Sequence, residues 1–229
     1  MLSLKLRHLS DWGKTLRVIT SISANGVGTF RLARKAIREK QAVQRTSELM
    51  SLLGMLRAFR PGLIMEIGTH KGGTLYCWPY VATEDATIIS LDLPNGPFGG
   101  GYAEQDAAKF QTFLKDKQSL ICLRKDSHLR ETFDTVVRVL GGKKIDFLFI
   151  DGDHTYDGVK ADFEDYSPLV RQGGLIAFHD IKPNPNMPEC QVHVFWQEIK
   201  QAFKHYEFID QSRTVQYGMG IGVLVNVYE

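Results

Sequence analysis

Residues 63–74 read LIMEIGTHKGGT, an apolar run followed by a glycine-containing turn. The run at 63–67 predicts a buried strand, because it is short, apolar and bounded by turn residues. Gly68 and Gly72 would let the backbone pass close to a ligand, and the start of the helix expected next would favour a carboxylate or a phosphate. Taken alone, the segment is equally well explained by a tight strand-to-helix turn that binds nothing.

Short apolar runs alternate with helical patterns on both sides of this turn. Helices are expected at 74–81, 103–116, 129–140 and 156–169, and strands at 63–67, 87–91, 119–123, 145–150 and 174–178. Such alternation predicts a parallel, doubly wound sheet. After a helix at 192–203, strands at 206–209 and 220–227 follow without a helix between them, which predicts an antiparallel pair at the edge. We therefore expect an α/β fold, with a Rossmann-like, mostly parallel seven-stranded sheet, an antiparallel edge strand and an N-terminal helical segment.

The first forty residues differ in charge from the rest of the chain. They carry nine Lys or Arg against Asp11 and Glu39, a net charge of +7 in a chain whose total is +2. We interpret residues 1–41 as a basic arm ahead of one catalytic domain at 42–229, with a helix expected at 42–59. A basic amphipathic arm is more often a helix packed on its own domain or on a partner subunit, but contact with an anionic membrane surface or a role in organelle targeting stays open. Nucleic acid is not expected as a partner, because the arm lacks a ladder of aromatic residues.

Composition narrows the class of protein further. The chain has 229 residues, enough for a sizeable core in one domain, and no apolar run near the ~20 residues that a membrane-spanning helix needs. Cys77, Cys122 and Cys190 form no CxxC pair, which argues against a disulfide framework and a thiolate zinc site. A reducing, cytoplasmic setting is therefore expected.

An acid follows the second predicted strand, as dinucleotide folds require for a ribose. Asp92 ends the run IISLD, where its carboxylate can accept hydrogen bonds from both ribose hydroxyls. Together with Asp92, the pattern Glu-x-Gly-x-x-x-Gly from Glu66 to Gly72 resembles class I S-adenosylmethionine-dependent methyltransferases rather than the Gly-x-Gly-x-x-Gly of nicotinamide enzymes. The resemblance implies that Glu66 helps to hold the amino-acid end of the cofactor, whereas an acid at this place would repel a pyrophosphate.

The same resemblance places adenine beside Asp126 and Ser127, which follow the third strand; a helix cap is an equally good explanation for these two. His70 and His128 are interpreted as loop residues near the cofactor. The full set predicted to bind the cofactor is Glu66, Gly68, Thr69, Gly72, Thr74, Asp92, Asp126, Ser127 and Asp151.

Acids and histidines end the fourth and fifth predicted strands. The run IDFLFIDGDHTY at 145–156 places Asp151 and His154 beyond the fourth strand, and the fifth ends in His179 and Asp180. Because neighbouring parallel strands end at one edge of the sheet, the two aspartates should face one crevice. Converging carboxylates repel unless a cation joins them, and Mg²⁺ or another hard divalent ion suits such a site.

These strand ends resemble the metal-dependent O-methyltransferases, a group with catechol-type, macrolide-sugar and cephalosporin hydroxylase-like branches. The likeness covers about residues 42–227. It implies that Asp151 and Asp180 are metal ligands, and that His154 is the general base, because the macrolide-sugar branch has a histidine where catechol-type enzymes have a lysine. His179 replaces one acid of that branch's second ligand pair, so the implied metal set is Asp151, His179 and Asp180, with an open ligand count and ion identity.

The resemblance implies that a methyl group moves from S-adenosylmethionine to a hydroxyl of a sugar, a phenol or a natural product. The divalent ion, expected to be Mg²⁺, would lower the pKa of the hydroxyl, and His154 would remove its proton. A helix-capping role for His154 remains the alternative, and Asp153 is interpreted as a cap rather than a ligand. The loops at 93–102 and 182–189 are expected to shape specificity, the first either as a lid or as an ordinary surface loop.

Two other functions share parts of this pattern. An NAD-dependent Rossmann oxidoreductase has the same strand, glycine turn and ribose acid. A binding module without catalysis would need only the basic arm, but the presence of Asp151, His154 and Asp180 together argues against it.

Overall fold

The structure is a computed structural model that describes residues 26–212 and 217–227. Most of the expected basic arm at 1–41 therefore lies outside the described residues. Its last part, from residue 26 onward, is placed, and the boundary between arm and domain stays a prediction.

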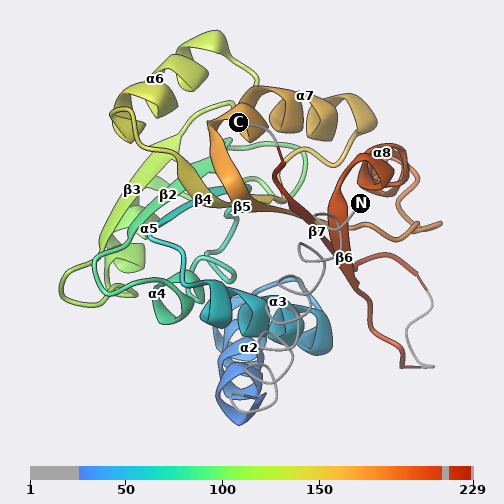
Figure 1. Ribbon diagram of the computed structural model, residues 1–229, viewed down its shortest axis with the longest axis horizontal. Coiled ribbons are helices and arrows are strands. Elements are labelled where there is room, and N and C mark those ends of the chain that lie inside the picture. Colours follow the sequence, from blue (N-terminus) through green and yellow to red (C-terminus); the bar gives the residue numbers. More distant parts are fainter. Residues whose placement is uncertain (1–25, 213–216, 228–229) are drawn as a thin grey trace, which may run out of the picture.

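Seven strands form one sheet in the order β3-β2-β1-β4-β5-β7-β6 (Figure 1). The strands are β1 (Leu63–Ile67), β2 (Thr87–Asp92), β3 (Ser119–Arg124), β4 (Ile145–Ile150), β5 (Val170–His179), β6 (Lys204–Phe208) and β7 (Ile221–Val225). The first five pair in parallel, whereas β7 is antiparallel to both β5 and β6. The doubly wound sheet with an antiparallel pair at one edge is confirmed; β7, one place inside the edge, is the strand that runs against the others.

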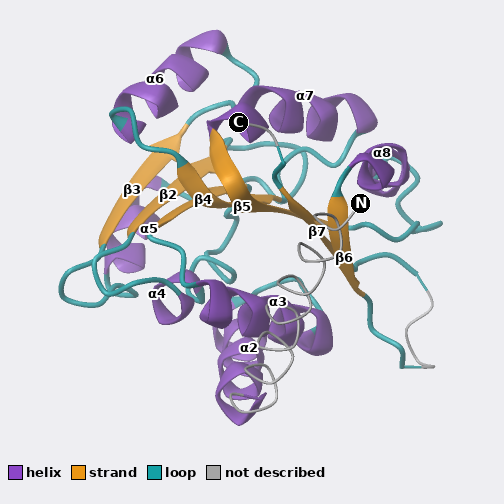
Figure 2. Ribbon diagram, viewed as in Figure 1, coloured by secondary structure: helices purple, strands orange, loops and turns teal. Residues whose placement is uncertain are grey.

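Helices cover both faces of the sheet and give the molecule three layers (Figure 2). One face carries α6 (Arg130–Leu140), α7 (Tyr156–Tyr166) and α8 (Val192–Ile199), with the 3₁₀ turns η1 (Ser167–Leu169) and η2 (Lys200–Ala202). The other carries α2 (Gly26–Lys40), α3 (Thr46–Phe59), α4 (Trp78–Val81) and α5 (Glu104–Gln111). Because side chains alternate along a strand, Ile64 of β1 joins the core on the second face and Met65 joins the core on the first.

The helix expected from residue 42 begins later, at Thr46. Arg45 keeps an extended backbone with φ −80° and ψ 144°, and Gln41 has a left-handed φ of 61°. Residues 41–45 therefore form a loop that packs against the glycine turn, where a Cβ on Gly73 would collide with Ala42. Hydrophobic periodicity gives no sign of this packing, because the apolar residues of the loop continue the helical pattern.

Two further helices differ in length from the sequence expectation. Residues 74–77 form turns, so that α4 begins only at Trp78, and α5 ends at Gln111 rather than near residue 116. In the placed part of the arm, α2 packs on α3 and buries Leu32, Ala33 and Ala36. Among the residues that the structure describes, no helix is both long enough and apolar enough to span a membrane.

Candidate active site

A cavity of about 720 Å³ lies at the carboxyl ends of β1, β4 and β5. Its wall includes the turn after β1, the residues that follow β4 and β5, the loop at 41–45 and residues 97–99. A second hollow of about 170 Å³ is lined by Asp92 and by residues 125–128. The two hollows are neighbours, because Gly68, His70, Pro97, Phe98 and Asp151 line both.

The carboxylate of Glu66 is fully buried beneath the turn after β1. It accepts hydrogen bonds from the hydroxyls of Thr69 and Thr74 and from the indole N–H of Trp78, at 3.1 Å for the indole. Burial raises the pKa of Glu66 to about 8. Glu66 therefore fixes the shape of the turn from below, and it reaches the cavity only through Thr69 and Thr74, which line it.

Gly68 and Gly72 give this turn a path that other residues cannot follow. Their φ values are +87° and +78°, in the left-handed region that favours glycine. A Cβ on Gly68 would also collide with the carbonyl of Asp151, and a Cβ on Gly72 would lie 2.5 Å from the ring of Phe110. The glycines thus bring the turn against the end of β4, which joins the predicted cofactor residues to the charged residues beyond that strand.

Asp92 connects the end of β2 to the same turn. Its Oδ2 accepts hydrogen bonds from the backbone N–H groups of Thr69 and His70, at 3.0 and 2.6 Å. Burial raises the pKa of Asp92, although these N–H groups oppose the rise. One carboxylate oxygen therefore holds the turn, and the side chain lines the second hollow; its role in binding a ribose stays a prediction.

The predicted adenine residues line the second hollow, and α7 holds one of them, Ser127. Tyr166 donates a hydrogen bond to the carbonyl of Ser127 at 2.8 Å, and Asp126 accepts one from the backbone N–H of His128 at 2.9 Å. The Nε2 atom of His128 lies 3.4 Å from Asp162, which is fully buried. The sequence interpretation of His128 as a loop residue near the cofactor missed this buried partner, because Asp162 is distant in the sequence and sits on another element.

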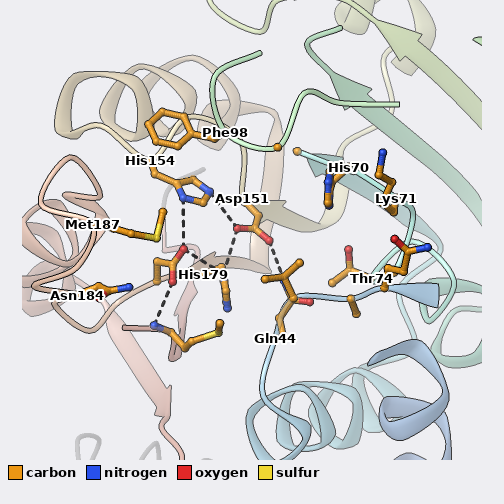
Figure 3. A pocket seen from close by; sticks show the side chains of 18 of the residues that line it. Gln44, His70, Lys71, Thr74, Phe98, Asp151, His154, His179, Asn184 and Met187 are labelled. Carbon is orange, nitrogen blue, oxygen red and sulfur yellow. Dashed lines mark hydrogen bonds and ion pairs between the residues drawn. The ribbon is translucent and has the colours of Figure 1, made fainter. Parts of the chain in front are cut away.

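Four charged side chains meet in the main cavity beyond β4 and β5 (Figure 3). The Oδ1 atom of Asp151 lies 3.2 Å from His179 Nδ1 and 3.5 Å from His154 Nε2. The Oδ2 atom of Asp180 lies 3.3 Å from His179 Nδ1 and 3.4 Å from His154 Nδ1. The expected convergence of the two aspartates is present, with both histidines bridging them.

The other two carboxylate oxygens are already bonded to the protein. Gln44 donates from Nε2 to Asp151 Oδ2 at 2.9 Å, and the backbone N–H of Met219 donates to Asp180 Oδ1 at 3.1 Å. Asp180 itself has a left-handed φ of 59°. Gln44 is a site residue that the sequence interpretation missed, because it lay inside what read as a continuous helix.

Electrostatics in this cluster favour the charged form of every member. Burial opposes the charge on each, but the neighbouring carboxylates raise the pKa of His154 to about 10 and that of His179 well above its ordinary value. Likewise, His179 holds the pKa of Asp151 and of Asp180 below the ordinary value despite their burial. Two imidazolium groups thus balance two carboxylates when no other cation is present.

The loop at 93–102 contributes an aromatic side chain to the rim of the cavity. Phe98, from the glycine-rich loop at 93–102, stacks on the ring of His154 with centroids 4.9 Å apart (Figure 3). This loop therefore reaches over the charged cluster.

The start of α7 decides the role of Asp153. Asp153 accepts a hydrogen bond from the N–H of Thr155, and the hydroxyl of Thr155 accepts one from the N–H of Gly158 at the start of α7. The interpretation of Asp153 as the helix cap is therefore wrong: Thr155 caps α7, and Asp153 holds the turn just before it.

The sequence is similar to a known protein family and to a protein of a bacterium. Residues 65–181 match the model of a family described as a methyltransferase domain. An uncharacterized protein named y4gI from Sinorhizobium fredii is 28% identical over 173 residues, which are 74% of this chain and 18% of that protein. The chain therefore spans less than a fifth of that relative's length.

Solved structures of low sequence identity share the fold. An O-methyltransferase from Bacillus cereus in complex with S-adenosylhomocysteine (SAH) has a TM-score of 0.57 at 16% identity, over 91% of this chain and 97% of that one. The MycE methyltransferase of the mycinamycin biosynthetic pathway, in complex with Mg, SAH and mycinamycin VI, has a TM-score of 0.57 at 15% identity, over 87% and 54%. At such identities the likeness establishes a Rossmann-like methyltransferase fold.

Proposed function

Because the chain belongs to the methyltransferase-domain family, we propose that it moves a methyl group from S-adenosylmethionine to a hydroxyl of a small molecule, with a divalent cation at the acceptor. One observation carries the proposal. The glycine turn and the cluster of Asp151, His154, His179 and Asp180 line the same cavity. A cofactor on the turn would therefore present its methyl group toward a hydroxyl held at the cluster.

The cofactor would extend through both hollows. Its adenosine would lie between Asp92 and the residues at 126–128, and its amino-acid end would lie on the turn above Glu66. S-adenosylmethionine supplies its own positive sulfonium, so the protein mainly has to hold oxygen, methyl carbon and sulfur in line. A turn fixed by the buried Glu66 network is suited to that positioning.

The cluster fits a divalent cation by its donor chemistry. Asp151, His179 and Asp180 each offer one ligand atom, and these atoms lie within 4.8 Å of one another. A bound divalent ion would lower the pKa of the acceptor hydroxyl. Its positive charge would also neutralise the two carboxylates. His154 would then not need to carry a positive charge.

His154 is proposed to remove the proton of the acceptor hydroxyl. Its ring lies beside both carboxylates and its Nδ1 atom, though buried, has no hydrogen-bond partner within the described residues. A neutral imidazole can accept a proton at neutral pH, as a general base must. The acceptor is proposed to be a sugar, a phenol or a natural product, held between Phe98, Asn184 and Met187 of the cavity wall (Figure 3).

Calorimetric titration with SAH and with NAD tests the cofactor assignment. We expect SAH to bind and NAD not to bind. Gly68→Ala should abolish SAH binding, because its Cβ would enter the carbonyl of Asp151. Gly141→Ala is the matched control, since Gly141 also has a positive φ, +56°, but open space around its Cβ position. Binding of NAD instead of SAH would favour an NAD-dependent oxidoreductase. Binding of neither would favour a binding module without methyltransferase activity.

A further inference from the structure

Each of the two aspartates in the cluster has one carboxylate oxygen bonded to the protein and one that faces His179. Gln44 and Met219 already bond to Asp151 Oδ2 and Asp180 Oδ1. The remaining oxygens, Asp151 Oδ1 and Asp180 Oδ2, both face the Nδ1 atom of His179. Two oxygens and one nitrogen are therefore the protein atoms that surround the place for an ion.

The spacing of these three atoms suits ligands of one ion. The nitrogen lies 3.2 and 3.3 Å from the two oxygens. Neighbouring ligands that are each about 2.1 Å from a common ion lie roughly 3 Å apart, so only a small adjustment is needed. Asp180 holds a left-handed φ of 59°, a costly conformation for an aspartate that is typical of functional sites.

His179 is fixed in this position by its surroundings. Its side chain is 3% exposed and lies at the end of β5, between the two carboxylates. To leave a site made of oxygen atoms alone, it would have to break its ion pairs with Asp151 and Asp180. Any ion bound between Asp151 and Asp180 therefore meets an imidazole nitrogen as well.

We propose that this site prefers a first-row transition ion, from Mn²⁺ to Zn²⁺, over Mg²⁺. Magnesium takes oxygen ligands and keeps several waters, whereas imidazole suits transition ions such as Mn²⁺, Fe²⁺, Ni²⁺, Cu²⁺ and Zn²⁺. This inference rests on the proposed function in taking Asp151, His179 and Asp180 as the ligands. It differs from the sequence expectation of Mg²⁺ because of one residue, His179.

A second group of donors at the same place leads to the same preference. His154, Asp180 and the buried Cys190 also offer ligand atoms within 4.8 Å of one another. Nitrogen and sulfur donors again suit transition ions rather than Mg²⁺. This second set lacks His179, so the His179→Glu variant distinguishes it from the set of Asp151, His179 and Asp180.

Calorimetric titration of the full-length, metal-free protein with MgCl₂, MnCl₂ and ZnCl₂ tests the inference without any acceptor substrate. We expect Mn²⁺ and Zn²⁺ to bind at least roughly tenfold more tightly than Mg²⁺. His179→Glu, which exchanges the nitrogen for an oxygen donor, should bring the three affinities closer together. His205→Glu is the matched control and should keep the wild-type ratio, because His205 lies in β6 and does not line the cavity.

Mg²⁺ binding as tight as that of Mn²⁺ and Zn²⁺ in the wild type would overturn the inference, as would an unchanged ratio in a folded His179→Glu. If that variant does not fold, His179→Gln should still lose Zn²⁺ affinity, and unchanged affinity would contradict the role of the imidazole. SAH is titrated into the same samples. If the wild type binds SAH normally but prefers Mg²⁺, only this inference is contradicted. If the wild type does not bind SAH, the proposed function is contradicted.

Discussion

The turn after β1 and the charged cluster after β4 and β5 are neighbours with opposite internal organisation. Beneath the turn, Glu66 receives three hydrogen bonds from its own surroundings, and Asp92 receives two backbone N–H groups. In the cluster, the buried atoms His154 Nδ1 and His179 Nε2 have no hydrogen-bond partner within the described part of the chain. The carboxylates of the first region are thus bonded to the protein itself, whereas the second region leaves two buried nitrogens without such a partner.

Glu66→Ala should break the first region and give the largest loss. It would leave the donors of Thr69, Thr74 and Trp78 unpaired in the core, and we expect a loss of about 3 kcal/mol in the free energy of unfolding, measured by denaturant titration. Glu66→Gln is the matched control, because it keeps an acceptor oxygen of the same shape, and should cost about 1 kcal/mol. If Glu66→Ala is as stable as the wild type, the network does not fix the turn.

His154→Ala should act on the chemistry of the second region. We expect turnover with an accepted substrate to fall roughly a hundredfold, because general-base catalysis typically contributes that much. Ion binding, measured by calorimetry, should persist, since Asp151, His179 and Asp180 remain. Unchanged turnover would contradict the role of His154 as general base.

Asp92→Ala tests whether the first region binds the cofactor as well as shaping the turn. SAH affinity should fall more than tenfold, about 1.4 kcal/mol, because the ribose would lose its acid. Asp92→Asn keeps one oxygen for the N–H groups of Thr69 and His70 and should lose less. An affinity equal to that of the wild type would remove Asp92 from the cofactor site.

The smallest effect concerns the wall of the second hollow. The ion pair with Asp162 is the main reason that the pKa of His128 rises from 6.5 to about 9. A raised pKa gives stability that is fully present below pH 6.5 and is lost as the pH rises through about 9. Because the side chain is 33% exposed, we discount the effect to about 1 kcal/mol. Thermal denaturation between pH 7 and 10 should therefore show a steeper loss in the wild type than in His128→Gln, and identical slopes would contradict the pairing.

The fold was accessible from the sequence because its signals are local. Apart from Asp146, the run at 145–150 is apolar, as a strand covered on both faces requires, and β4 has those same bounds. β5 begins four residues before its predicted start. The prediction missed this part of the strand because Arg171, Gln172 and Gly173 are exposed and carry no apolar pattern. Glycine spacing likewise pointed to Gly68 and Gly72, whose φ values are positive.

The missed site residues depend on contacts between distant parts of the chain. Gln44 meets Asp151 across 107 residues, and neither neighbourhood contains a sign of the other. His128 meets Asp162 only because α7 packs beneath the second hollow. Strand ends can be aligned from topology alone, but a side chain that comes from a loop before α3 or from a helix face requires the packed structure.

Methyl transfer measured before and after chelation tests the central claim, that the first region binds the cofactor by itself and the second needs an ion. Removal of the ion from the full-length protein should abolish transfer to an accepted substrate, and return of a divalent ion should restore it, because an aliphatic hydroxyl is poorly acidic without a Lewis acid. SAH affinity should barely change in the same samples. Full activity of the chelated enzyme would contradict the account, and His154 would then have to act without an ion.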